Sequence, residues 1–247
     1  GVSGHVVGGI YVGGLVGSVN GGTIVASYST ASVIGISHVG GLIGSVYGSD
    51  YYSPAVIEAT FSTGAVTGEE YVGSLIGYGS GEVNVNVNYA VGPVLSQSSY
   101  RGFIGYSGYM DGVNSENYWA TDTVGVTTLE SGAIGYTLVE LQCRTYVDDL
   151  TCENDLYSTW NSYLDEFGEP YWDFGNSSQL PGLLIRGAVY RDSDADGVLD
   201  NNDQFPANPA IASDSDLDGY PDAWTISCDI DCRTDSGFIL DMLPNNP

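Results

Sequence analysis

A short glycine-rich motif recurs through the first half of the chain, and this repeat limits the folds that the chain can adopt. The copies read VGGLVGS, VGGLIGS, VGSLIGY and RGFIGY, and they begin at Val12, Val39, Val72 and Arg101. Their central apolar residues, Leu15, Leu42, Leu75 and Phe103, follow one another at spacings of 27, 33 and 28 residues. A unit of this size with only short apolar segments cannot bury its own apolar face, whereas stacked copies can.

Each repeat has a second half that contains an aromatic residue: Tyr28, Phe61, Tyr89 or Tyr118. Short apolar and small residues alternate between glycines, which predicts two or three short strands per repeat. Helix is disfavoured because glycine and β-branched residues dominate. We therefore expect a mainly β fold: a Gly-rich β-solenoid, or β-helix, of about four coils over residues 1–126. A β-sandwich with coincidental repeats is the alternative.

In such a solenoid, equivalent residues of successive repeats form ladders. We expect the leucine positions to form one internal ladder and the aromatic positions to form another, with stacked rings. The glycine pairs would supply the positive φ angles that the corners need and would allow neighbouring coils to approach closely.

Residues 127–187 interrupt the repeat and are expected to form a capping or closing segment. Leu156, Trp160 and Leu164 recur at helical spacing, which is compatible with one short helix. A cap over the last coil would hide its strand edge. The alternative is an exposed aromatic platform for a sugar. The tryptophans of that platform would be Trp119, Trp160 and Trp172.

Aspartate dominates the last part of the chain, because residues 188–247 contain 13 Asp and no Glu. A DxDxDG pattern starts at Asp192 and again, 22 residues later, at Asp214. Carboxylates at positions 1, 3 and 5 converge when the backbone wraps around one centre, and glycine at position 6 allows the sharp turn. A carbonyl at position 7 and carboxylates at positions 9 and 12 would complete an oxygen shell suited to Ca²⁺. The predicted ligands are Asp192, Asp194, Asp196, Val198, Asp200 and Asp203, and then Asp214, Asp216, Asp218, Tyr220 and Asp222.

Calcium fits this acidic region better than a transition metal or a solvated tail does. Zinc and copper would favour His or Cys ligands, and a merely solvated acidic tail would not be expected to repeat the pattern. Position 12 of the second loop is Thr225, so we expect that loop to borrow a ligand from its neighbour. Residues 188–247 are therefore expected to form a small calcium-binding module.

The four cysteines are close in pairs, which favours two local disulfides, Cys143–Cys152 and Cys228–Cys232. No histidine lies near them in the sequence, and their spacing does not match a paired CxxC zinc site. Disulfides indicate an oxidising compartment.

The charge balance excludes several classes of partner. The chain has 31 acidic residues against five arginines, lacks lysine, and carries a net charge of −26. It has no basic surface with which to neutralise nucleic-acid phosphates or to dock on anionic lipid. No run approaches the roughly 20 apolar residues of a membrane span. We therefore expect neither nucleic-acid binding nor membrane insertion.

The sequence does not predict an enzyme. Arg101 is the only basic residue in the predicted coils, whereas a β-helical polysaccharide lyase needs cationic groups beside its base. The glutamates have no repeat-matched partner that would mark the carboxylate pair of a glycosidase. His5 and His38 do not occupy equivalent repeat positions, and we expect neither to be catalytic.

The repeat region resembles the GLUG-motif family of bacterial surface proteins through Gly14–Gly17 (GLVG) and Gly41–Gly44 (GLIG). Segments similar to the closing part of such arrays are Tyr118-Trp119, Gly132–Gly135, Leu141-Gln142, Trp172–Gly175 and Gln179–Leu183. The likeness covers about residues 1–186 and implies a β-solenoid architecture rather than an activity. The fourth copy departs from the pattern at Arg101 and Phe103.

The aspartate-rich part is similar to thrombospondin type 3 repeats, in which Asp side chains wrap calcium with little hydrophobic core. Besides the two loops, the spacer Asp203–Pro209 and the terminal Leu243–Pro247 carry this likeness, over about residues 191–247.

These features favour a secreted, non-enzymatic structural protein of the bacterial cell surface, either an adhesin or the subunit of a head-to-tail filament. Gly4–Tyr11 aligns with Ala31–His38, the second half of a coil, so the first full coil would have an incomplete neighbour. A second copy can pair with such an edge and so build a homopolymer through the solenoid ends. The alternative for this start is a fragment of a larger adhesin that begins mid-repeat.

The alternative function is a carbohydrate-binding or carbohydrate-active β-helix module. Exposed aromatic residues, calcium and acidic groups would suit glycans as partners.

Overall fold

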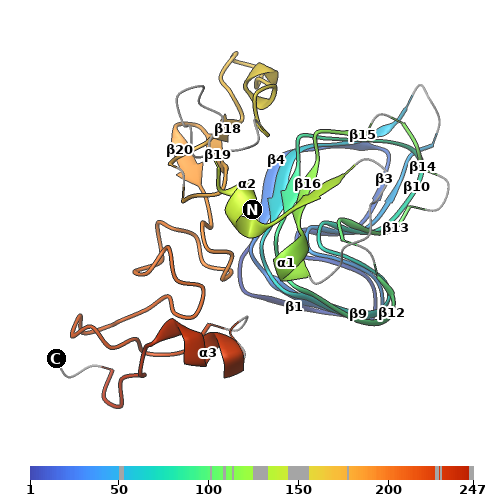
Figure 1. Cartoon of the computed structure of the whole chain (residues 1–247). Helices are drawn as coiled ribbons and strands as arrows, with labels where there is room; N and C mark the ends of the chain where they lie inside the picture. Colours follow the sequence, from blue (N-terminus) through green and yellow to red (C-terminus); the bar gives the residue numbers. More distant parts are fainter. Residues whose placement is uncertain are drawn as a thin grey trace.

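The fold is mainly β and is built around large parallel sheets (Figure 1). The computed structural model describes residues 1–49, 53–100, 102–107, 110–112, 114–124, 133–143, 156–176, 178–225, 228 and 230–244. Within these ranges, no helix has both the length and the apolar character needed to cross a membrane.

Successive repeats contribute successive layers of short strands. The first layer contains β1 (His5–Val7), β2 (Ile10–Gly13), β3 (Val16–Asn20) and β4 (Gly22–Ser29). The second contains β5 (Ser32–Ile34), β6 (Ser37–Gly40), β7 (Ile43–Tyr47) and β8 (Ala55–Ser62). The third contains β9 (Val66–Gly73), β10 (Ile76–Asn86) and β11 (Tyr89–Ala90). The fourth contains β12 (Val94–Tyr100), β13 (Ile104–Tyr106), β14 (Met110–Asp111), β15 (Asn114–Ser115) and β16 (Tyr118–Ala120).

The rest of the chain adds small elements beside these four layers. They are α1 (Thr121–Val124), β17 (Ile134–Tyr136), α2 (Leu138–Leu141), a 3₁₀ turn at Trp160–Ser162, β18 (Trp172–Asp173), β19 (Gly182–Ile185), β20 (Ala188–Tyr190) and α3 (Ile230–Ser236). Strand β17 pairs in parallel with β16, whereas β18, β19 and β20 form a separate antiparallel sheet.

Equivalent residues of successive repeats are parallel neighbours in the sheets. Val12 pairs with Val39, and Val39 pairs with Val72. The spacing of the motif along the sequence is therefore the spacing of hydrogen-bonded neighbours. Seen as in Figure 1, the strands enclose a nearly closed, barrel-like cross-section.

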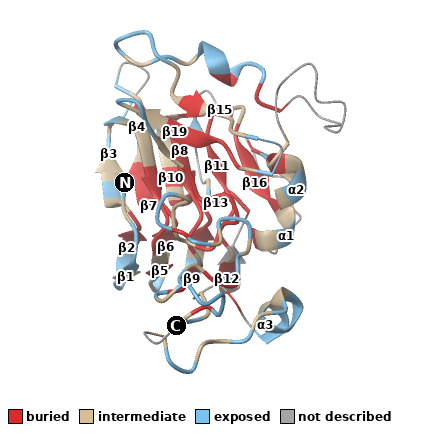
Figure 2. Cartoon of the chain, turned by 90° about the vertical axis from the view of Figure 1, so that its left-hand side faces the viewer, coloured by how far each residue is buried: buried red, intermediate tan, exposed pale blue. Residues whose placement is uncertain are grey.

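The leucine ladder lies inside this cross-section, as predicted. The backbone N–H of Leu15 donates to the carbonyl of Leu42 (2.9 Å), and Leu42 donates in turn to Leu75 (2.9 Å). Leu75 donates to Phe103 (3.0 Å), and all four side chains pack in one core cluster. Figure 2 shows how the buried residues gather on the stacked strands.

The aromatic ladder forms with stacked rings, but the prediction that it is internal is wrong. Phe61 stacks on Tyr28 at 5.2 Å and on Tyr89 at 5.1 Å between ring centroids. These rings belong to a second core, separate from the interior cluster that contains Ala90 and Trp119. Because neighbouring strand residues point to opposite faces, Tyr89 faces outward where Ala90 faces inward.

Residues 156–195 cover this outer ladder and complete the second core. Trp172 contacts Phe61 and Tyr89, and Trp160 stacks on Tyr118 at 5.6 Å. The Tyr89 hydroxyl donates to the carbonyl of Pro181 (2.8 Å). The aromatic ladder therefore holds the middle of the chain against the side of the stacked layers.

The predicted helical stripe in this segment does not form within the described residues. Trp160 begins a 3₁₀ turn, while Leu164 makes an antiparallel bridge with Pro170 and is 47% exposed. Packing of Trp160 among other rings overrides the weak helical periodicity. The three tryptophans Trp119, Trp160 and Trp172 are buried and form no exposed platform.

The glycines of the repeated motif provide close packing rather than positive φ, whereas the pair Gly21 and Gly22 takes φ angles of 68° and 86°, as predicted. A Cβ on Gly13 would lie 2.1 Å from the carbonyl oxygen of Val16 and 2.5 Å from the amide nitrogen of Gly44. Gly13 is not among the residues with positive φ. The motif thus brings two strands of one layer into close contact with the next layer. The backbones approach so closely that there is no room for a side chain.

Non-glycine residues also take left-handed conformations in the layers. Tyr11, His38 and Tyr71 have φ angles of 58°, 56° and 52° in equivalent positions of three layers. Their rings contact one another and also meet tyrosines from the strands on the other side of the glycine turn: His38 lies 4.9 Å from Tyr78, and Tyr71 lies 5.2 Å from Tyr106. This half-buried aromatic packing accompanies a backbone conformation that L residues otherwise avoid.

A buried polar ladder runs through the same layers. The side-chain oxygen Oδ1 of Asn88 accepts from the backbone N–H and the hydroxyl of Thr60, both at 2.8 Å. Its amide donates to Asn117 (2.9 Å), whose amide reaches the carbonyl of Val85 (2.7 Å). These bonds satisfy polar groups that would be costly to leave unpaired in the interior.

One predicted disulfide is confirmed. Cys228 and Cys232 are bonded, with a Cα–Cα distance of 5.2 Å. The other predicted pairing involves Cys152, which lies outside the described residues.

Candidate metal centre

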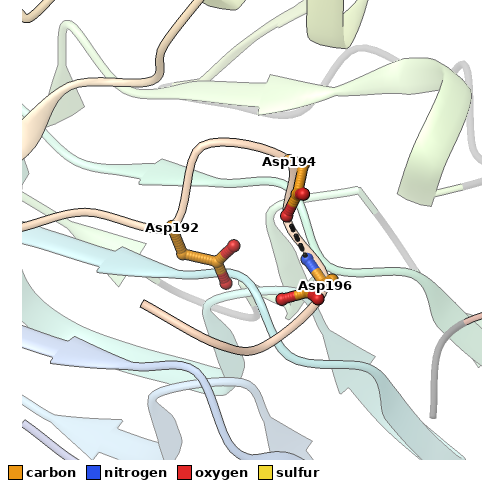
Figure 3. Close-up of side chains that lie close together, drawn as sticks. All are labelled: Asp192, Asp194 and Asp196. Atoms are coloured by element: carbon orange, nitrogen blue, oxygen red, sulfur yellow. Dashed lines mark hydrogen bonds between the residues drawn. The ribbon is translucent and has the colours of Figure 1, made fainter. Parts of the chain in front are cut away.

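The first aspartate loop leaves β20 and turns sharply over Asp192–Asp196. Gly197 has a φ of 96° and Ala195 a φ of 62°, so the backbone reverses twice within a few residues. Asp192 Oδ2 accepts from the Gly197 N–H (3.0 Å), and Asp196 Oδ1 accepts from the Val198 N–H (2.7 Å). Asp194 Oδ1 accepts from the Asp196 N–H (3.3 Å; Figure 3). The predicted need for glycine at position 6 is thereby explained.

The loop brings Asp192, Asp194 and Asp196 together. One carboxylate oxygen from each lies within 4.8 Å of the others, and all three residues are buried. Each also keeps an oxygen that is buried and has no hydrogen-bond partner, as does Asp203. Carboxylate oxygens that lie close together, and that include buried atoms without donors, suit a hard divalent cation such as Ca²⁺.

Burial makes these carboxylates difficult to ionise without a cation. Desolvation, followed by the charges of neighbouring aspartates, raises the pKa of Asp194 and of Asp196 to about 8. Desolvation also raises the pKa of Asp192 to about 8, against a hydrogen bond from Thr63 that lowers it. Burial raises the pKa of Asp203 to about 6.

The nearest arginine in sequence does not neutralise this cluster. Arg191 forms an ion pair with Asp173 and donates from Nε to the carbonyl of Leu180 (2.6 Å). A cation from solution would supply the missing charge at the carboxylates.

The second loop repeats the geometry of the first. Gly219 and Leu217 have φ angles of 94° and 63°. Asp214 Oδ2 accepts from the Gly219 N–H (2.9 Å), and Asp218 Oδ1 accepts from the Tyr220 N–H (2.8 Å). One carboxylate oxygen from each of Asp214, Asp216 and Asp218 lies within 4.8 Å of the others, but only Asp214 is buried. The second triad is thus the more solvent-exposed copy.

The aspartates at position 9 have a visible structural role. Asp200 accepts from the backbone N–H and the hydroxyl of Ser193, both at 2.7 Å. Asp222 accepts from the same groups of Ser215, at 3.0 and 2.7 Å. These contacts tie the end of each loop to its start. A direct bond from either carboxylate to a metal, and the carbonyl ligands Val198 and Tyr220, remain predictions.

The first loop is docked on the stacked layers, a feature that the sequence does not predict. The Thr63 hydroxyl donates to Asp192 Oδ2 (2.5 Å) from the turn after β8. Gln142, at the end of α2, donates to the carbonyl of Ser193 (2.9 Å). A Cβ on Gly197 would lie 3.0 Å from the carbonyl oxygen of Thr30. The triad is therefore buried because it sits against other parts of the chain.

A capping box positions Gln142 for this contact. Thr137 Oγ1 accepts from the Glu140 N–H (3.3 Å), and Glu140 Oε2 accepts from the Thr137 N–H (2.7 Å). Hydrogen bonds from Thr137 lower the pKa of Glu140. This reciprocal cap fixes the short helix α2, which Gln142 caps at its C-terminal end.

Comparisons with known proteins identify no relative. No protein-family model matches the chain, and no curated protein or solved structure matches it either. The fold and the loops define a mainly β protein with large parallel sheets and two aspartate triads that could hold metal ions.

We expect the calcium-free protein to lose stability as the pH rises from about 4 to about 8. The pKa values of Asp192, Asp194 and Asp196 are about 8 in the folded chain, well above the ordinary value of 3.8. The folded state then binds more protons than the unfolded state across this window, so raising the pH favours unfolding.

Thermal unfolding of calcium-stripped protein between pH 5 and pH 9 measures this slope, and excess calcium should restore stability most strongly above pH 8. Asp194→Asn should make the Tm of the calcium-free protein depend less on pH. The matched change Asp216→Asn in the exposed loop should leave this pH dependence as it is in the unaltered protein. A calcium-free Tm that rises steadily from pH 5 to pH 8 would contradict the assignment.

Proposed function

We propose that the protein is a secreted, non-enzymatic structural protein of the bacterial cell surface, stabilised by calcium. In this proposal residues 1–126 form a GLUG-type β-solenoid, residues 127–187 close it, and residues 188–247 are thrombospondin type 3-like calcium repeats. The protein acts as an adhesin or as the subunit of a head-to-tail filament.

The solenoid part of the proposal is supported by the constant register of the layers. Residues separated by one repeat are parallel neighbours at the valine, leucine and aromatic positions alike. Such a stack extends by addition of further layers without a change in local structure. Rigidity along one axis suits a structural role better than a catalytic one.

The observation that carries the calcium role is the docking of the first aspartate triad on the layers. Thr63 gives a hydrogen bond to Asp192, the same residue whose Oδ1 is buried without a partner. An ion held by the triad would satisfy this oxygen and would keep the carboxylate charged as an acceptor for Thr63. Calcium would then stabilise the first aspartate loop and would also hold the aspartate-rich region against the solenoid.

Calcium removal should release this fastening. We expect chelation to raise hydrogen exchange in residues 189–200 and in the second half of β8, while the leucine ladder stays protected. Exchange measured by mass spectrometry with and without calcium tests this directly.

A variant separates the docking contact from the loop itself. Thr63→Val should weaken calcium binding at the first loop about tenfold, because it removes a hydrogen bond to a charged group. The exposed Thr23→Val on β4 is the matched control and should bind as the unaltered protein does. Equal affinities in the two variants, or exchange that calcium does not change, would refute the fastening role.

The proposed self-association is supported by the open edges of the stack. In the sheets that the structure describes, β2 and β3 each pair only with the second layer, and β12 and β13 pair only with the third. The first layer of one copy and the β12 and β13 edges of another, with which β17 does not pair, therefore offer parallel edges of the same kind. Contacts of this type are heterologous and continue into a fibre.

Edge variants test the filament. Electron microscopy of the protein in calcium should show fibres, and Val7→Lys with Ile10→Lys should abolish them. Both side chains are exposed in the first layer, at 72% and 60%. Ile239→Lys, at 73% exposure in the last part of the chain, is the control and should leave the fibres intact. Monodisperse monomer at high concentration would contradict self-association.

A further inference from the structure

A cleft of about 390 Å³ lies between the stacked layers and the aspartate-rich region. Ser3, Thr30 and Gly64 line it from the layers, while Val198, Asn202 and Trp224 line it from the two aspartate loops and their surroundings. Its volume falls in the range of about 300–1,000 Å³ that is usual for small-molecule sites.

The cleft presents an aromatic surface and several small polar groups. Trp224 is the one tryptophan of the four that is not buried. Its position is fixed by a β-bridge to Ile211 and by the neighbouring Thr225 N–H, which donates to the carbonyl of Ala210 (2.8 Å). The facing wall carries the hydroxyl residues Ser3 and Ser32.

The charge of the cleft selects against anions. Among the described residues that line it, none is basic, and Asp196 of the first triad forms part of its wall. A phosphate or a uronic acid would gain no ion pair here and would face the strong negative charge of the chain. A neutral ligand that has both an apolar face and hydroxyl groups fits this combination of aromatic ring, amide and hydroxyls.

We infer that the cleft binds a neutral saccharide of one or two rings, stacked on Trp224 and hydrogen-bonded by Asn202 and the hydroxyls of the facing wall. Because its two walls come together only when the first aspartate loop is docked, binding requires calcium. This calcium dependence rests on the proposed function, whereas the saccharide site rests on the cleft itself.

A glycan array probed with the full chain in millimolar calcium identifies the saccharide, and calorimetry with the best neutral ligand gives its affinity. Trp224→Ala should weaken binding at least tenfold, and Asn202→Ala should weaken it several-fold. Phe167→Ala removes an exposed aromatic ring that does not line the cleft, so its affinity should stay within twofold. Removal of calcium with a chelator should abolish saccharide binding.

The outcomes separate this inference from the calcium proposal. If calcium binds and docks the loop but no neutral glycan is retained, or if Trp224→Ala and Asn202→Ala both bind normally, the saccharide site is wrong. Preference for acidic glycans would also overturn it. If the chain binds no calcium and a neutral glycan still binds through Trp224, the calcium proposal is wrong. The saccharide site is then correct, but binding at it does not depend on calcium.

Discussion

Parallel pairing between equivalent residues of successive repeats is the constraint on which the rest of the structure depends. It places Leu42 over Leu15 and Phe61 over Tyr28, so that one register creates an interior core and an outer aromatic ladder together. A slip of one residue would exchange the inward and outward faces of every strand. The close contacts at Gly13 and Gly40 make such a slip sterically costly, because only glycine fits there.

The second core holds the middle segment of the chain against the stacked strands. The middle segment packs on the outward rings of Phe61, Tyr89 and Tyr118, on one side of the layers. That segment leads through β20 to Asp192, and Tyr190 stacks on Tyr28 at 5.4 Å just before the first aspartate loop. Aromatic packing therefore places the triad beside Thr63, where burial raises the pKa of its carboxyl groups and a bound cation would compensate their charge.

The sequence was sufficient to predict the repeat register, the interior leucine ladder, the Cys228–Cys232 bond and the convergence of Asp192, Asp194 and Asp196. Each of these follows from spacing within one unit or between equal units. The outward direction of the Tyr28 ladder was not predictable, because alternating residues on a strand buried on both faces are apolar on either side. The Thr63–Asp192 contact joins residues 129 positions apart, and no local pattern encodes it. The Ser-Thr pairs at Ser29 and Ser62 were a repeated signal, but only the folded chain shows what one of them binds.

The most direct test of the account is a crystal structure of the protein grown in calcium, with anomalous scattering used to locate the ions. We expect a cation bonded to Asp192, Asp194 and Asp196 at about 2.3–2.6 Å, with the Thr63 hydroxyl still hydrogen-bonded to Asp192 and the loop packed on the layers. A triad without a cation at millimolar calcium, or ions held by loops that have separated from the layers, would contradict it.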